Sequence, residues 1–163
     1  MVCGLSGCAG EQGPVPATPE EQDYIDQVVA RFYLAGYSLN TLSSIYDNPK
    51  PDDDEWRDTA EALLDQVTRM FEGAATLNPP PSLADLHQKA VKTLGHWNTA
   101  ALLLKSDYDA GIYEFSEEVE VELAIADETF EEVDALLNEF LTDHPIPDVE
   151  SKPSSSGSAD ESD

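Results

Sequence analysis

Cysteine is almost missing from this chain of 163 residues. The two cysteines are Cys3 and Cys8, so residues 9–163 contain none. This excludes a disulfide framework and a cysteine-based metal site from the main body of the protein. The sequence also has no run of about 18 apolar residues, the length that a membrane-spanning helix requires. It therefore predicts no transmembrane segment.

Basic residues are scarce as well. Eight Lys and Arg stand against 34 Asp and Glu, which gives a formal net charge of −26. Nucleic-acid binding depends on Lys and Arg at phosphates, so this class of function is excluded. The same charge would repel anionic lipid headgroups, which leaves a covalent lipid as the means of membrane attachment. Such an excess is tolerated best in salty surroundings and favours a halophilic or marine source, with an ordinary acidic secreted protein as the alternative.

Motifs that carry chemistry are missing too. The sequence has no Glu-x-x-His pair for a di-iron site, no phosphate-binding loop and no paired polar groups for a nucleophile. His87 and His96 are nine residues apart, so they lie on opposite faces of a helix. Residues 107–111 resemble the start of an EF-hand loop, but Ile112 stands where a glycine is needed, and Gly111 fits a helix end better. We therefore expect no enzyme activity, no cofactor and no metal site.

The first eight residues carry the most specific motif. Leu5-Ser6-Gly7-Cys8 resembles the lipobox of prokaryotic lipoproteins, in which the cysteine accepts a diacylglycerol and becomes the mature N-terminus. The resemblance implies that residues 1–8 are the remnant of a signal peptide and that Cys8 is lipidated. A basic region and an apolar stretch of about 7–15 residues should precede a lipobox, so we expect the true start to lie upstream of Met1. Residues 9–18 are predicted to be a flexible tether.

Four series of apolar residues, each with steps of three and four, follow the tether. Each has seven positions and predicts an amphipathic helix. The stripes are Ile25, Val28, Phe32, Ala35, Leu39, Leu42, Tyr46; Trp56, Ala60, Leu63, Val67, Met70, Ala74, Leu77; His87, Ala90, Leu94, Trp97, Ala101, Leu104, Tyr108; and Val119, Leu123, Ala126, Phe130, Val133, Leu137, Phe140. Short connections predict an all-α, up-down-up-down antiparallel four-helix bundle over residues 19–142. Residues 143–163 are expected to form a disordered acidic tail.

Capping residues agree with these helices. Thr18 and Glu21 form a capping box, with a proline at the first helical position. Ser82 is expected to cap the third helix in the same way, with Asp85 in place of Glu or Gln. Ser116 can cap the fourth helix.

Folding the stripes back at the loops predicts the layers of the core. One central layer contains Ala35, Val67, Trp97 and Phe130, so that a small residue faces a large one, as close packing requires. His87, in a terminal layer, is expected to be a partly exposed edge residue without a function.

The end of the bundle away from the N-terminus is a candidate binding surface. Aromatic side chains of the terminal layer meet two acidic loops there, and aromatic groups rimmed by charge suit a recognition surface. The alternative is that the aromatic rings close the bundle while the acids solvate helix ends. The candidate residues are Tyr46, Asp52, Asp53, Asp54, Trp56, Asp107, Tyr108, Asp109 and Tyr113.

These observations together predict a membrane-anchored extracytoplasmic lipoprotein with a non-catalytic binding or structural role. Its attachment would be the lipid on Cys8, and it would have an unidentified protein or cation partner. Two alternatives stay open: a ligand-sensing or cofactor-binding extracytoplasmic bundle, and an acidic surface protein that buffers cations.

Overall fold

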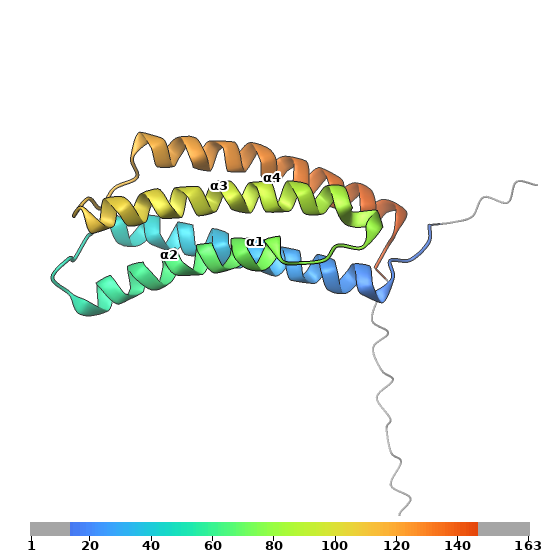
Figure 1. Ribbon diagram of the computed structural model, residues 1–163, viewed down its shortest axis with the longest axis horizontal. Coiled ribbons are helices and arrows are strands. Elements are labelled where there is room, and N and C mark those ends of the chain that lie inside the picture. Colours follow the sequence, from blue (N-terminus) through green and yellow to red (C-terminus); the bar gives the residue numbers. More distant parts are fainter. Residues whose placement is uncertain (1–13, 147–163) are drawn as a thin grey trace, which may run out of the picture.

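The computed structural model describes residues 14–146, which form four long helices and one short 3₁₀ helix. They are α1 (Pro19–Tyr46), α2 (Asp54–Ala75), η1 (Pro81–Leu83), α3 (Ala84–Asp109) and α4 (Glu117–Asp143). Consecutive long helices pack side by side, as an up-down bundle requires (Figure 1). The all-α four-helix bundle predicted from the stripes is therefore confirmed. We call the end where α1 begins and α4 ends the terminal end, and the opposite one the loop end.

The start of α1 follows the predicted capping box. The Glu21 backbone N–H donates to Thr18 Oγ1 at 3.3 Å, and the Thr18 backbone N–H donates to Glu21 Oε2 at 2.8 Å. Pro19 occupies the first helical position. Because its missing N–H would have no partner there in any case, the proline favours the helix start at no cost in hydrogen bonding.

The starts of α3 and α4 differ from the prediction. Ser82 does not cap α3: it lies within η1, and its hydroxyl donates to Glu21 Oε1 at 2.5 Å. The N-cap of α3 is Leu83, which makes no side-chain capping bond because the turn of η1 leads directly into the helix. Ser116 does hold the N-cap position of α4, but its side chain makes no capping bond.

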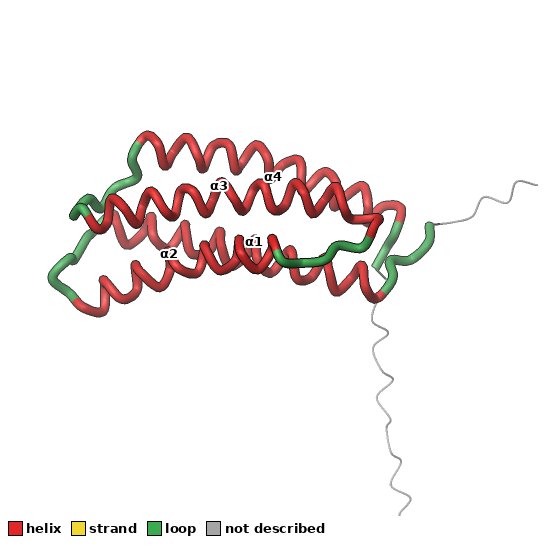
Figure 2. The backbone as a smooth tube through the Cα atoms, in the orientation of Figure 1, coloured by secondary structure: helices red, strands yellow, loops and turns green. Residues whose placement is uncertain are grey.

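Helix α2 is shorter than its neighbours, with 22 residues against 28 in α1. Figure 2 shows the loop that follows α2 running lengthwise beside the helices toward the terminal end. Pro80 and Leu83 are buried, and Leu77 and Leu83 pack against the core there. An extended, proline-containing segment thus takes the place of the last turns of α2.

The core consists of two clusters that meet at Trp97, which packs against both. Leu42, Val67 and Leu104 are fully buried in the loop-end cluster, and Ala35 and Leu94 in the terminal-end cluster. The predicted stripes therefore supply most of the core.

The predicted central layer is wrong at one position. Phe130 is 40% exposed, and the preceding residue, Thr129, is buried in its place. The cause is that α4 packs against α3, whereas the backbones of α1 and α4 stay apart along nearly their whole length. The Phe130 ring spans the gap and touches Phe32 and Trp97, with ring centroids 5.2 Å and 6.2 Å away.

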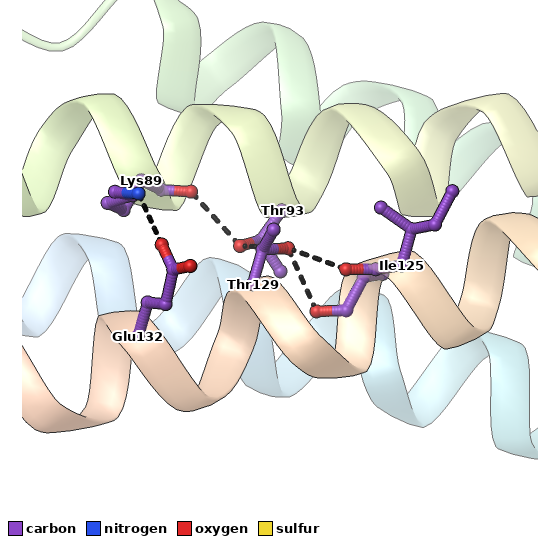
Figure 3. A network of polar contacts seen from close by, with 6 residues as sticks. Lys89, Thr93, Ile125, Thr129 and Glu132 are labelled. Carbon is purple, nitrogen blue, oxygen red and sulfur yellow. Dashed lines mark hydrogen bonds and ion pairs between the residues drawn. The ribbon is translucent and has the colours of Figure 1, made fainter.

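A pair of buried threonines sets how α4 lies on α3. Thr93 Oγ1 and Thr129 Oγ1 are 3.0 Å apart (Figure 3). Thr129 Oγ1 donates to the carbonyls of Ile125 and Ala126, and Thr93 Oγ1 lies 3.0 Å from the Lys89 carbonyl. Because buried hydroxyls need partners, this pair favours the rotation of α4 that turns Thr129 inward and Phe130 outward.

A double-mutant cycle tests the threonine pair. We expect Thr93→Val and Thr129→Val each to lower the free energy of unfolding by about 1 kcal/mol, because each leaves the other hydroxyl without its cross-helix partner. The double variant should lose clearly less than the sum, since it leaves neither hydroxyl behind. Urea denaturation of the four proteins measures the coupling, and additive losses would contradict it.

Charge is distributed unevenly between α3 and α4. Ten acidic residues and no basic residue lie between Ser116 and Leu141. Lys89 pairs with Glu132, and His96 Nδ1 lies 2.7 Å from Glu122 Oε2. The third helix therefore offsets part of the charge of the fourth, but pairs such as Asp127 and Glu131 still repel each other at one-turn spacing.

Salt is expected to stabilise the fold. Like-charged pairs along α4 alone cost a few tenths of a kcal/mol each, so we expect molar NaCl to raise the free energy of unfolding by at least about 1 kcal/mol. The urea midpoint at low and at molar NaCl measures the effect. The double variant Asp127→Asn/Glu131→Gln should be more stable than the parent at low salt and should respond less to NaCl. A urea midpoint that does not move with salt would contradict this expectation.

The two ends of the described chain lie together at the terminal end. The Ala17 backbone N–H donates to the Pro145 carbonyl at 3.2 Å, and His144 Nδ1 lies 3.0 Å from the Val15 carbonyl. Ala17 is buried. Residues 14–17, which belong to the predicted tether, are thus held against the end of α4.

Candidate functional site

The aromatic residues of the predicted surface come together at the loop end. Trp56 stacks on Tyr108, with ring centroids 6.1 Å apart, and meets the edge of Tyr113 at 5.2 Å. Tyr46 lies 5.9 Å from Trp56. Tyr46, Trp56 and Tyr108 are buried, whereas Tyr113 is half-buried. The rings therefore close this end of the core and leave little aromatic surface for a partner.

Three buried polar atoms at this end have no hydrogen-bond partner within the described residues. They are the hydroxyl oxygens of Tyr46 and Tyr108 and Asp107 Oδ2. Burial raises the pKa of Tyr46 far above its ordinary value, and the neighbouring Tyr108, Tyr113 and Asp107 add to the effect. Burial also raises the pKa of Tyr108. Both hydroxyls are thus neutral at physiological pH.

Most of the predicted acidic residues have local roles. Asp53 caps α2 and accepts from the backbone N–H groups of Glu55 and Trp56. Asp54 pairs with Arg57, and Asp109 lies 3.6 Å from Lys105. Asp52 is exposed. These contacts fit the alternative in which the acidic residues cap helices or pair with nearby basic residues. Binding of a partner at this surface stays a prediction.

Metal-ligating side chains are dispersed in the part of the chain that the structure describes. It contains no group of three His, Cys, Asp or Glu that could hold a metal ion. His87 Nδ1 lies 2.9 Å from the Tyr24 hydroxyl, and His96 faces Glu122 on α4. Cys8, the predicted lipidation site, lies outside the described residues.

A groove between α1 and α4 was not predicted. Near the terminal end it deepens into an apolar cavity of about 190 Å³. Its walls come from both helices, and Leu86 of α3 contributes as well. The lining residues are Ile25, Val28, Val29, Phe32, Leu86, Phe130, Val133, Asp134 and Leu137. The cavity exists because α1 and α4 stay apart, so their facing side chains cover each other only in part.

The groove continues toward the loop end. A second hollow shares Val29, Phe32 and Phe130 with the first and adds Tyr33, Tyr37 and Trp97. A third shares Asn40 with the second and reaches Tyr46 and Tyr113. We call this row of three adjoining hollows the α1–α4 groove. It runs along α1 from Ile25 to Tyr46.

Apolar side chains in the groove are unusually exposed. Tyr33 is 71% exposed, Tyr37 56% and Val29 46%. The three residues lie one turn apart on α1, beside the buried stripe. This second apolar stripe on α1 is a sequence signal for the groove, and it was not used in the prediction. A single exposed apolar residue is ordinary, so only the alignment of the three residues is informative.

The charged residues that line the groove are all acidic. Asp134 lies at the deep cavity, and Asp47, Glu114 and Glu120 line the hollow near the loop end. No Lys, Arg or His is among the described residues that line the three hollows. The groove therefore combines an apolar floor with an acidic margin.

Comparison of this chain with protein-family models, with curated proteins and with solved structures found no match. In the described residues, no helix is both long enough and apolar enough to cross a membrane.

Proposed function

We propose that this protein is a non-catalytic binding module, attached by a lipid on Cys8 to the extracytoplasmic side of a membrane, and that it receives its partner in the α1–α4 groove. The observation that carries the proposal is the exposed apolar groove. Aligned apolar side chains that stay exposed to water along a groove often mark a site where a ligand or partner binds. Aromatic side chains such as Tyr33, Tyr37 and Phe130 are also the type that contributes most to binding.

The position of the groove suits a membrane-bound protein. Residues 14–17 are held against the end of α4, so only five residues lie between Cys8 and Pro14. A segment of this length reaches at most about 20 Å. The deep cavity lies in the half of the bundle nearest to this segment. A lipid on Cys8 would therefore hold the cavity close to the membrane surface and within reach of membrane-bound partners.

Intact mass tests the attachment. The protein should be made from its full reading frame in a host that processes lipoproteins. We expect a chain that begins at Cys8 and carries a diacylglyceryl group, and we expect Cys8→Ala to abolish this form. An unmodified chain that retains residues 1–7 would refute the attachment and leave the groove unaffected.

Binding of a neutral apolar dye tests the groove. Nile red should show a saturable fluorescence increase with the folded protein, because its uncharged rings can enter the apolar cavity without repulsion from the acidic surface. Phe130→Ala and Val29→Gln should weaken this binding by about tenfold. Leu102→Ala, which alters an exposed apolar side chain of α3 outside the groove, is the matched control. Equal binding by all of these variants would refute the groove as the binding site.

A further inference from the structure

We infer that the partner of the α1–α4 groove is a basic amphipathic helix that lies along it. The inference rests on the proposed function, since it names the chemistry of the partner at the same site. Three features of the groove carry it: its length, its apolar floor and its acidic margin.

The length of the groove matches that of a helix. Ile25 and Tyr46, at its two ends on α1, are 21 residues apart in the sequence. At 1.5 Å per residue this corresponds to about 32 Å, the length of a helix of about 21 residues. A partner helix would lie between α1 and α4 and roughly parallel to both, as helices in four-helix bundles do.

The floor of the groove fits the apolar stripe of such a helix. Phe32 and Phe130 form its centre, and Val28, Val133 and Leu137 continue it toward the terminal end. Apolar side chains that recur at i, i+3, i+4 and i+7 on the partner would meet this floor along its length. Tyr33 and Tyr37, now in water, would cover the partner from the α1 side.

The margin of the groove determines the sign of the partner's charge. Asp134 lies beside the deep cavity, and Asp47, Glu114 and Glu120 lie near the loop end. The described lining contains no basic side chain, so the charged groups that Lys and Arg of the partner would meet at the two ends of the groove are all acidic. Such complementarity accelerates association and selects against acidic partners.

Other occupants fit the charges less well. A second copy of the chain would bring another charge of −26 to the interface. Residues 147–163 of the same chain hold few apolar residues and several acidic ones, so they offer no apolar stripe. Anionic lipid headgroups would be repelled as well. A basic amphipathic helix is the occupant whose apolar stripe matches the apolar floor of the groove and whose positive charge matches its acidic margin.

The experiment uses the full chain and a fluorescently labelled synthetic peptide of about 21 residues, with leucines at i, i+3, i+4 and i+7 and lysines elsewhere. A scrambled peptide of the same composition is the first control. We expect fluorescence anisotropy to show binding of the amphipathic peptide at least about tenfold tighter than binding of the scrambled one. Circular dichroism should show the bound peptide as helical. The difference should persist in 1 M NaCl, where screening removes attraction by charge alone.

Groove variants with matched controls locate the peptide. The paired variant Tyr33→Ala/Tyr37→Ala, at exposed and therefore tolerant positions, should weaken binding by about tenfold or more. Leu102→Ala and Val121→Ala remove exposed apolar groups elsewhere and should change binding by less than about twofold. Asp134→Asn should reduce affinity more than Asp65→Asn on α2, and this difference should shrink as NaCl rises.

The inference would be overturned by equal binding of the amphipathic and scrambled peptides, by equal loss in the groove and control variants, or by loss of all binding in 1 M NaCl. Sedimentation that shows dimers, abolished by Tyr33→Ala/Tyr37→Ala, would assign the groove to a second copy. Flotation with neutral phosphatidylcholine vesicles, also abolished by this variant, would assign it to lipid. If Nile red binds at the groove and the peptide does not, the proposed function stands and only the basic helix is refuted.

Discussion

The Leu94→Ala substitution is expected to lower the free energy of unfolding by about 3 to 5 kcal/mol, the range for a leucine whose site cannot collapse. Leu94 is fully buried in the terminal-end cluster of the core. Its removal would leave a void that the surrounding side chains fill only in part. Urea denaturation followed by far-UV circular dichroism measures the loss.

Phe130→Ala is the informative comparison for Leu94→Ala. Both residues belong to the predicted core stripes, but Phe130 is 40% exposed and packs mainly on Phe32 and Trp97. We expect its removal to cost only about 1 to 2 kcal/mol, because much of the ring is already in water. A loss as large as that of Leu94→Ala would mean that α1 and α4 close on each other in solution, and the groove would then not exist.

The sequence was sufficient to predict the helices and their order. Steps of three and four in the apolar residues marked four helices, and the short connections required neighbours to run antiparallel. Thr18 and Glu21 marked the start of α1 correctly because both halves of a capping box lie within four residues. A capping box depends only on residues that are close together in the chain, so it can be recognised in a single sequence.

The rotation of α4 could not be predicted in the same way. Thr129 and Phe130 are adjacent, and both fit a helical stripe, so hydrophobicity alone favoured the phenylalanine. The structure buries the threonine because Thr93, which lies 36 residues earlier, offers it a hydrogen bond at 3.0 Å. Such a contact between helices is visible only once their mutual orientation is known.

The candidate site, like the fold, could be predicted from the sequence only in part. The aromatic residues at the loop end were predicted to come together, and Tyr46, Trp56, Tyr108 and Tyr113 do so. The groove was not predicted because it results from the distance between α1 and α4 in the folded protein. No sequence motif encodes that distance. Its only trace in the sequence is the second apolar stripe on α1.

Alkaline pH is expected to destabilise the protein through its buried tyrosines. Burial raises the pKa of Tyr24 to about 12, although the charge of Arg31 opposes the shift. In the unfolded chain a tyrosine has a pKa of about 10. Between these two values the unfolded state has released the proton and the folded state still holds it, so the free energy of unfolding falls as the pH rises. Below pH 10 the stabilising contribution is present in full.

The expected loss is large. Each such tyrosine lowers the free energy of unfolding by about 1.4 kcal/mol per pH unit, so Tyr24 accounts for about 2 to 3 kcal/mol between pH 10 and 12. Burial also raises the pKa of Tyr46, so this residue adds to the loss in the same direction. Tyr24→Phe should flatten the decline by about 1.4 kcal/mol per pH unit, because phenylalanine has no proton to release. Urea denaturation from pH 9 to 12 measures both proteins, and curves that stay parallel across this range would contradict the assignment to Tyr24.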